Sequence, residues 1–279
     1  MRRLSAGIIA TLAAAQLLAA QGQVFAAQGK LTASPTELAQ VAQTRWEVVS
    51  SEVDQGAASG IEHRHVELAK GGDRATIDVA LFSAKSASLR VIDDPEGSDR
   101  LAEAMQRANC VAGVNGGYFD TTFKPIGLRV VDGAVTSPLV RARLLNGVLC
   151  DSGRGIEIKR LAEFSPQRKL NAALECGPLL VDGGKAVSKL DATRSARRTF
   201  AAITRGGKAA LGVSSDLTLA QLAELLGNDR SMANDFKIWR AMNLDGGSSS
   251  AFWFKKADGG IFAISEDKAV RDFVGVASK

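Results

Sequence analysis

Histidine is scarce in this chain. Only two of the 279 residues are histidine, His63 and His65. Their spacing places both on the same side of a strand, far upstream in sequence from the three cysteines. This scarcity argues against a zinc site built on histidine and against a cysteine–histidine catalytic pair. The cysteines are Cys110, Cys150 and Cys176.

Several functional motifs are also missing. No Gly-Lys-Ser/Thr follows a glycine-rich loop, which excludes a phosphate-binding P-loop, and no helix of the right kind follows one to make a dinucleotide fingerprint. The sequence Gly-x-Ser-x-Gly is absent, so Ser249 lacks the setting of a hydrolase nucleophile. The net charge is +5, but the basic residues are scattered, with one tyrosine and three tryptophans. We therefore expect no nucleic-acid partner.

The N-terminus has the pattern of a secretory signal peptide. Arg2-Arg3 is a short basic start, Ile8 to Ala20 is apolar, and Val24-Phe25-Ala26 supplies small residues at a cleavage site. We predict a signal peptide over residues 1–26, a flexible lead over 27–43, and a periplasmic or secreted protein. An uncleaved anchor is the alternative. No later run is apolar and long enough to span a membrane, so we expect no stable span after cleavage.

Export bears on the cysteines. An oxidising compartment allows one disulfide and one leftover thiol. The alternative is that all three cysteines are small buried apolar residues, and the sequence favours neither.

Short strands dominate the remainder of the chain. Frequent glycine turns separate them, and the regular alternation of strands with long helices that marks a doubly wound fold is absent. We predict an α+β fold with a large mixed or antiparallel sheet and a few helices, as a single catalytic domain over residues 44–279. The expected strands are 44–53, 61–68, 75–82, 89–92, 110–114, 127–131, 134–136, 144–150, 155–158, 179–181, 199–205, 208–214, 238–244, 251–254, 262–264 and 274–276. The expected helices are 99–108, with Ser98 as N-cap, and 218–226, ended by Gly227.

Two loops of similar composition carry the chemical interest. One is Asn115-Gly116-Gly117 with Asp120 nearby, and the other is Asn243-Leu244-Asp245-Gly246-Gly247. Each follows an apolar strand. Paired glycines let a ligand approach the backbone closely, and a neighbouring aspartate can act as acid or base, hold a cation or fix a sugar hydroxyl. The alternative is two tight turns whose asparagine and aspartate bond their own backbone.

The order of four blocks resembles the phosphodiester glycosidase family. The blocks are VNGGYFD followed by PIGL, then CGPLLVDGG, then RRTFAAITRGG, and finally AMNLDGGSSSAF, within a resemblance that spans roughly Ala75 to Ala277. Members hydrolyse a sugar from a phosphodiester, and bacterial members are typically exported and act on cell-surface glycans. The resemblance therefore implies an exported hydrolase with a carbohydrate phosphodiester substrate.

The motif residues carry over position by position. They are Asn115, Gly116, Gly117 and Asp120; Gly177 and Pro178; Arg198 and Thr199; and Asn243, Asp245, Gly246 and Gly247. The chain departs from the family at Ser248, which replaces a third glycine, while Ser249 keeps the family's serine. A side chain at residue 248 narrows the permitted backbone angles and affects how closely a substrate can approach.

Within this resemblance we assign roles. Asp245 is the first choice for acid–base work and Asp120 the second, because glycosidic cleavage commonly uses two carboxylates. Arg198 would hold the phosphate, since a guanidinium forks onto phosphate oxygens. The remaining predicted binding residues are Asn115, Asn243, Thr199, Ser249 and the glycines 116, 117, 246 and 247. Glu175 is a further carboxylate with weaker support. No cofactor is demanded, and a divalent cation on Asp120 or Asp245 is left open.

Two other functions compete with this interpretation. One is a glycan-binding or envelope-assembly protein that kept the fold and lost catalysis, which the departure at Ser248 allows. The other is a general phosphodiesterase, which would break the phosphorus–oxygen bond. The sugar, the anomeric outcome and the oligomeric state are not read from the sequence.

Overall fold

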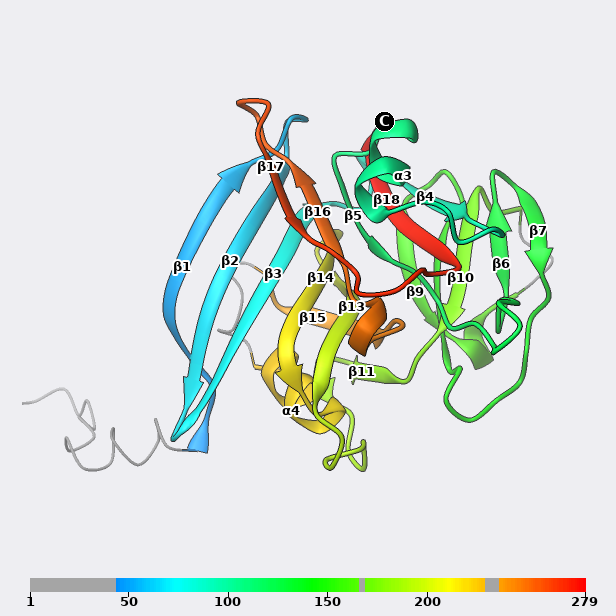
Figure 1. Cartoon of the computed structure of the whole chain (residues 1–279). Coiled ribbons are helices and arrows are strands. Elements are labelled where there is room, and N and C mark those ends of the chain that lie inside the picture. The colour runs from blue at the N-terminus through cyan, green and yellow to red at the C-terminus, as the bar shows by residue number, and fades with distance from the viewer. Residues whose placement is uncertain (1–43, 166–168, 229–235) are drawn as a thin grey trace, which may run out of the picture. The chain divides into compact units, whose positions relative to one another are not determined.

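The structure is a computed structural model that describes residues 44–165, 169–228 and 236–279 (Figure 1). The predicted signal peptide and lead lie outside the described residues. The described residues lie within one compact unit, Gln43–Lys279. None of its helices, within the described residues, is long and apolar enough to cross a membrane.

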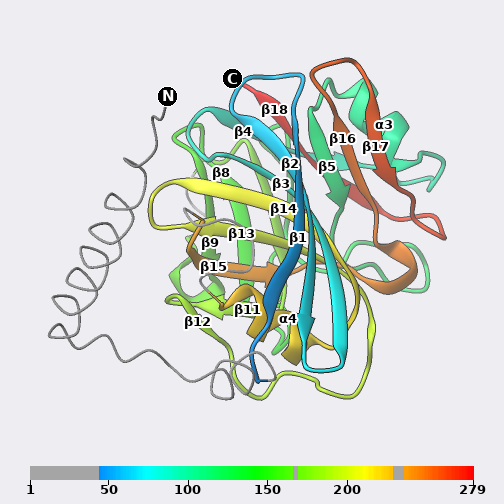
Figure 2. The ribbon, with the colours of Figure 1, turned by 90° about the vertical axis from the view of Figure 1, so that its left-hand side faces the viewer.

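The largest sheet has eight strands in the described residues, all antiparallel to their neighbours. Its first three strands lie side by side at one edge (Figure 2). The Gly71-Gly72 turn joins two of them, with Lys70 paired to Asp73. In spatial order the strands are β1 (Glu47–Gln55), β2 (Ile61–Lys70), β3 (Asp73–Ser83), β14 (Lys208–Leu217), β13 (Ala196–Thr204), β15 (Ile238–Asn243), β11 (Leu179–Asp182) and β12 (Lys185–Ala186).

Two five-stranded sheets complete the described fold. One has the order β7 (Ala134–Ser137), β6 (Arg129–Val131), β10 (Ala172–Cys176), β8 (Gly147–Asp151) and β9 (Ile156–Arg160). The other has the order β17 (Ile261–Ile264), β16 (Phe252–Lys255), β5 (Ala112–Asn115), β18 (Asp272–Ser278) and β4 (Ala87–Asp93). The pairing in both is antiparallel. The fold is therefore mostly β, built from several antiparallel sheets, and the predicted α+β class describes it only loosely.

Two α-helices occur in the described residues. The predicted helix α4 (Leu219–Leu226) begins after Thr218, whose hydroxyl accepts a hydrogen bond from the Gln221 amide at 3.2 Å, and ends at Gly227. The helix α3 (Leu101–Arg107) begins after Arg100, so the predicted N-cap Ser98 is wrong. The amides of Ser98 and Asp99 bond the Asp94 carboxylate instead. Two short 3-10 helices are η2 (Leu161–Glu163) and η3 (Gly247–Ser249).

Both faces of the central strands of the large sheet are covered, because their alternate residues enter two different apolar clusters, whereas the edge strand β1 is exposed. On β3, Ala80 and Phe82 belong to the core that contains residues of all three sheets. Val79 and Leu81 belong to a second cluster, which includes Leu222 of α4. The second half of β3, Val79 to Phe82, is apolar on both faces. In its first half Arg74, Thr76 and Asp78 alternate with apolar residues, which makes the strand recognisable in the sequence.

The cysteines and histidines have structural surroundings. The three cysteines are buried and form no disulfide with one another. Burial raises the pKa of Cys110 to about 11 and that of Cys176 to about 12. His63 and His65 lie on one side of β2, as predicted, and both contact Asp78 Oδ1, at 3.0 and 2.9 Å.

Candidate active site

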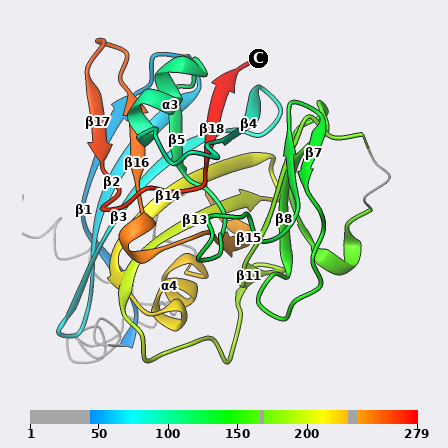
Figure 3. The same cartoon turned by 45° about the vertical axis from the view of Figure 1, so that its right-hand side comes forward.

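The two glycine-rich loops meet where β5 and β15 end and β13 begins. The Leu244 amide donates to the Thr199 carbonyl at 2.8 Å, and the Asp245 amide donates to the Gly116 carbonyl at 3.0 Å. The η3 turn follows directly and lies beside β13 (Figure 3). Gly116 and Asp245, which are far apart in the chain, are thus joined by a main-chain hydrogen bond, so the two loops form a single structure.

Asn115 ties the two loops to β13. Its Nδ2 donates to the Asp245 carbonyl at 2.8 Å, and its Oδ1 accepts from the Thr199 hydroxyl at 2.6 Å and the Ala251 amide at 3.1 Å. The Thr199 hydroxyl also contacts the Ser250 hydroxyl at 3.1 Å. Asn115 and Thr199 are fully buried. Their polar atoms are already engaged, so these two predicted binding residues hold the loops in place.

Asn243 pairs with a residue that the sequence did not single out, Tyr118. Asn243 Nδ2 donates to the Tyr118 hydroxyl at 2.8 Å, and that hydroxyl donates to the Gly177 carbonyl at 2.7 Å. Burial raises the pKa of Tyr118, which keeps it a neutral phenol. The Gly177–Pro178 peptide bond is cis, and the Pro178 carbonyl accepts from the Asn243 amide at 2.9 Å. Asn243 Oδ1 is buried without a hydrogen-bond partner among the described residues.

A buried ion pair supports the first loop. Arg129 and Asp272 are both fully buried and bonded to each other. Asp272 Oδ1 accepts from the Gly117 amide at 2.8 Å, and Arg129 Nη2 donates to the Tyr118 carbonyl at 2.9 Å. At Gly116 an added Cβ would lie 1.7 Å from Asp272 Oδ1. Only glycine fits there, because the ion pair occupies the space of a side chain.

The Asp245 carboxyl group lies in the second loop, in surroundings that shift its pKa. Its side chain is largely buried, and burial raises its pKa. The nearby Ser249 hydroxyl and the Gly246 amide, which donates to Asp245 Oδ1 at 2.9 Å, oppose this rise. The Ser249 hydroxyl acts on the carboxyl without a well-formed hydrogen bond: its Oγ is buried and finds no partner among the described residues. A carboxyl that keeps its proton above the usual pH can serve as a general acid.

Arg198 lies next to this loop. An added Cβ on Gly246 would be 3.8 Å from Arg198 Cδ. The guanidinium donates through Nε to the Leu217 carbonyl at 2.8 Å and through Nη2 to the Arg194 carbonyl, and burial lowers its pKa. Within the described residues it has no carboxylate partner. Its side chain is held in position while its charge is not neutralised, which suits it to bind an anion.

The second loop opens outward after Asp245. Gly247 has φ +66° and an added Cβ would meet nothing within 4 Å. Ser248, the departure from the family pattern, is exposed. The extra side chain at residue 248 therefore projects from the open part of the loop and leaves the buried frame unchanged.

Asp120 sits in a different environment from Asp245. It is exposed, and its Oδ1 accepts from the Thr122 amide and hydroxyl, both at 2.8 Å, and from the Lys124 amide at 3.0 Å. These hydrogen bonds, with that from Lys124 foremost, lower its pKa. The adjacent Phe119 lies 5.5 Å from Lys268 Nζ, and Lys268 also lowers the pKa of Asp245. Asp120 is thus an ionised carboxylate in its own turn, on the loop that contacts Asp245.

Glu175, the weaker carboxylate, is fully buried. Its Oε2 accepts from the Leu128 amide at 2.8 Å and the Val140 amide at 2.9 Å, so it organises neighbouring loops. As for metals, the described residues contain no group of three or more acidic, histidine or cysteine side chains placed to hold an ion. The expectation from the sequence that no cofactor is demanded stays a prediction.

Three functional candidates were missed by sequence reasoning: Tyr118, Arg129 and Asp272. Arg129 and Asp272 are 143 positions apart and carry no shared motif. Tyr118 is the only tyrosine of the chain and stands inside the first glycine loop, which was a usable signal.

Comparison with known proteins places this chain in a family of glycosidases. A model of the phosphodiester glycosidase family matches residues 108–277, and the chain belongs to that family. No curated protein matches it in sequence.

Two solved structures resemble the chain. One is the zebrafish N-acetylglucosamine-1-phosphodiester alpha-N-acetylglucosaminidase catalytic domain, auto-inhibited by its pro-peptide, with a TM-score of 0.59, 17% identity, and coverage of 83% of this chain and 89% of that one. This similarity supports a shared fold. The other is a protein of Burkholderia pseudomallei, with a TM-score of 0.48, 13% identity and 75% coverage of each chain, a similarity too weak to support an argument.

Proposed function

We propose that this protein is an exported hydrolase that releases a sugar from a sugar-1-phosphodiester in cell-surface or extracellular glycans. Membership of the phosphodiester glycosidase family supports the reaction class. The observation that carries the proposal is local. Asp245, a carboxyl group with a raised pKa, is adjacent in sequence to Gly246. Gly246 lies beside Arg198, whose guanidinium has no carboxylate partner among the described residues.

Each group has a defined part in the proposed reaction. Arg198 binds the phosphodiester oxygens through its uncommitted N–H groups. The water oxygen becomes bonded to the anomeric carbon, and the bond from that carbon to the phosphodiester oxygen breaks. Protonated Asp245 donates its proton to the departing oxygen, and ionised Asp120 is the proposed second carboxylate, which accepts the proton of water. The two carboxyls suit these opposite roles because burial raises the pKa of Asp245 while hydrogen bonds lower that of Asp120.

The unpartnered polar atoms fit a ligand beside Asp245. Asn243 Oδ1 and Ser249 Oγ are both buried without hydrogen-bond partners among the described residues. Buried polar atoms are usually paired, so orphaned atoms in one loop indicate that something polar completes them. A sugar hydroxyl or a water at the anomeric carbon would do so. Gly246 and Gly247 leave the backbone accessible there.

The position of the labelled oxygen tests the bond that is broken. The purified protein is incubated with N-acetylglucosamine-1-phosphodiesters and other sugar-1-phosphodiesters in ¹⁸O water. We expect the label on the released sugar. Label on the phosphate would identify a phosphodiesterase and overturn the proposal. Ligand retained by the wild-type protein without release of sugar would identify a glycan-binding protein, the competing function.

The exported setting is tested separately. The full chain is expressed in a bacterium, and the N-terminal residue of the purified product is sequenced. We expect the periplasmic or secreted protein to begin at residue 27. A product in the cytoplasm that keeps residue 1, or a full-length chain in the membrane fraction, would contradict export by a cleaved signal peptide.

A further inference from the structure

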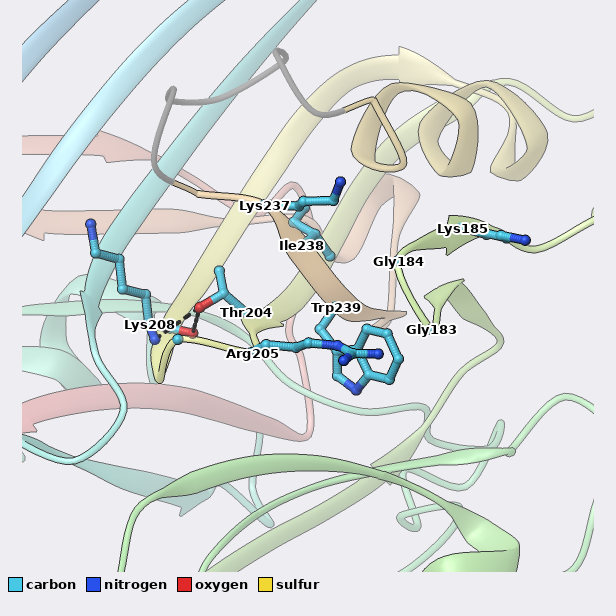
Figure 4. Close-up of a pocket in the computed structure, with 10 residues that line it drawn as sticks. Gly183, Gly184, Lys185, Thr204, Arg205, Lys208, Lys237, Ile238 and Trp239 are labelled. Carbon is cyan, nitrogen blue, oxygen red and sulfur yellow. Dashed lines mark hydrogen bonds between the residues drawn. The ribbon is translucent and has the colours of Figure 1, made fainter.

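A cavity of about 460 Å³ lies at the far end of the strands that lead to the candidate active site. It is lined by residues from the turns after β11 and β13 and from the start of β15 (Figure 4). The residues that matter here are Arg205, Trp239, Lys185, Lys237, Gly183 and Gly184. The proposed reaction uses none of them.

The strands separate this cavity from Asp245. Strand β13 runs from Arg198, near the active site, to Thr204 at the cavity, which is about 20 Å at the usual rise per residue. Strand β15 runs from Ile238 at the cavity to Asn243 in the active-site loop. The two sites therefore lie at opposite ends of the same antiparallel strands and cannot be subsites for one sugar.

Arg205 is the side chain of the cavity that most clearly indicates a ligand. Its guanidinium carbon lies 3.5 Å from the centroid of the Trp239 ring, and Figure 4 shows the two side chains together. Among the described residues Arg205 forms no ion pair. Stacking on an aromatic ring holds the planar guanidinium by its face, which leaves the N–H groups around its edge available to an oxyanion. Arg205 is thus pre-positioned and its charge is not compensated.

The surroundings of Trp239 keep the stack in place. The Gly184 amide donates to the Trp239 carbonyl at 3.0 Å, and the Gly183-Gly184 turn lies against the indole ring. Lys185 also lines the cavity, and none of the described residues that line it is acidic. The side chain of Lys208 points away from Trp239, so its ammonium group does not face the stacked pair (Figure 4).

We infer that this cavity binds phosphate groups of an anionic glycan, with the Arg205 guanidinium stacked on Trp239 as the principal contact. Oxyanion binding follows from the cavity and its charge alone. We further infer that the oxyanion belongs to a long sugar-phosphate chain, another linkage of which is cleaved at Asp245. This second step rests on the proposed function. The net charge remains positive after Arg2 and Arg3 of the predicted signal peptide are removed, which agrees with an anionic partner.

Tryptophan fluorescence reports on this cavity selectively. The chain has three tryptophans, of which Trp46 and Trp253 are each 1% exposed, whereas Trp239 is only partly buried. Acrylamide quenching of the intact protein therefore reads mainly Trp239. The probes are inorganic phosphate and an oligomer of N-acetylglucosamine 1-phosphate. To prevent turnover, the oligomer is titrated into the Asp245→Asn protein, which retains the cavity.

We expect the oligomer to protect Trp239 from quenching at a lower concentration than inorganic phosphate does. Arg205→Ala in the same background should weaken oligomer binding by about tenfold or more, the effect of losing a charge-assisted hydrogen bond. Arg154→Ala, which removes an exposed arginine from the turn between β8 and β9, is the matched control and should bind normally. Because Arg205→Ala also changes the local field at Trp239, isothermal titration calorimetry of the same variants gives an independent affinity.

The outcomes separate this inference from the proposed function. Unchanged oligomer affinity in Arg205→Ala, or an equal loss in Arg154→Ala, would overturn the site. If the oligomer binds no more tightly than inorganic phosphate, the inference that the bound oxyanion belongs to a glycan would be overturned. Failure of the proposed function would appear elsewhere, as absent turnover of a monomeric sugar-1-phosphodiester by the wild-type protein, while Arg205-dependent binding persisted. We expect Arg205→Ala to leave turnover of that monomeric substrate unchanged.

Discussion

The two glycine-rich loops share a sequence pattern but differ in surroundings. In the loop after β5, Gly116 is enclosed by the buried Asp272 carboxylate, and Asp120 is exposed in its own turn. In the loop after β15 the arrangement is reversed, because Asp245 is largely buried and Gly247 faces open space. The glycine of the first loop is therefore enclosed while its aspartate is exposed. In the second loop the glycine is open and the aspartate is largely buried. The same sequence pattern can therefore hold the backbone in place or present a reactive carboxyl group, depending on the side chains that pack against it.

The largest expected difference between the loops is in catalysis. Asp245→Asn should lower kcat/KM for a sugar-1-phosphodiester by about 10³-fold, because the general acid is lost, and leave the fold intact. Asp120→Asn keeps the turn, since asparagine makes the same local bonds, and should reduce turnover less. Steady-state kinetics and circular dichroism of both variants provide the measurement. An undiminished rate in either variant would remove that residue from the mechanism.

The glycines should differ in stability. Gly116→Ala places a methyl group on the buried Asp272–Arg129 pair and should lower the free energy of unfolding by about 3 kcal/mol or more. Gly247→Ala meets no neighbour and carries only the cost of its positive φ, about 1–2 kcal/mol. Chemical denaturation of both variants compares them. Equal losses would show that Gly116 is less confined than its surroundings indicate.

Two adjacent arginines beside the second loop sharpen the comparison further. Arg198→Ala should raise KM for phosphodiester substrates by about 10–100-fold, the effect of a lost hydrogen bond to a charged group, and should affect neutral glycosides far less. Arg197, which pairs with Asp267 at the surface, is the control, and Arg197→Ala should change little. Equal losses on charged and neutral substrates would argue against a phosphate contact by Arg198.

The smallest effect expected is the pH dependence of stability, and its sign should be opposite for the two acids. Because burial raises the folded-state pKa of Asp245, its stabilising contribution is complete below the unfolded pKa and is lost as pH rises through the folded value. The loss is about 1.4 kcal/mol for each unit of pKa difference. For Asp120 the folded-state pKa is lowered, so its contribution is present above the unfolded pKa and is lost as pH falls.

Denaturation between pH 3 and 7 of the wild type and the two Asp→Asn variants measures these slopes. The stability of the wild type relative to Asp245→Asn should decrease with rising pH, and that relative to Asp120→Asn should increase. Slopes of the same sign would show that Asp120 and Asp245 do not differ as their surroundings indicate.

Much of the fold could be predicted from local pattern. The hairpin of β13 and β14 and the helix α4 with its Thr218 cap were predicted because their signals lie within a few residues of one another. The N-cap of α3 was predicted wrongly, because the helix begins two residues later, where the Arg100 and Leu101 amides donate to the Glu103 and Glu266 carboxylates. Strand β10 was missed because it is buried throughout and shows no alternation. The division into three sheets depends on long-range pairing that no local pattern encodes.

The candidate site shows the same limit. Motifs pointed to Asn115, Arg198 and Asp245, and the structure brings the segments that carry them together, while their functional roles remain predictions. The motifs did not indicate that the Asn115 side chain would be engaged in internal hydrogen bonds, because its partners come from β13 and the second loop. The Arg129–Asp272 pair was invisible for a related reason: each partner lies in an unremarkable strand.

By itself the sequence determined where strands turn, which residues could carry charge beside a flexible backbone, and membership of a glycosidase family. Those properties depend on neighbours in the chain and on residue type. Only the tertiary structure decided which aspartate is buried, which glycine is confined and which arginine lacks a partner. Burial and pairing are set by side chains that are remote in sequence, and a pKa or a steric limit exists only once those side chains are in contact.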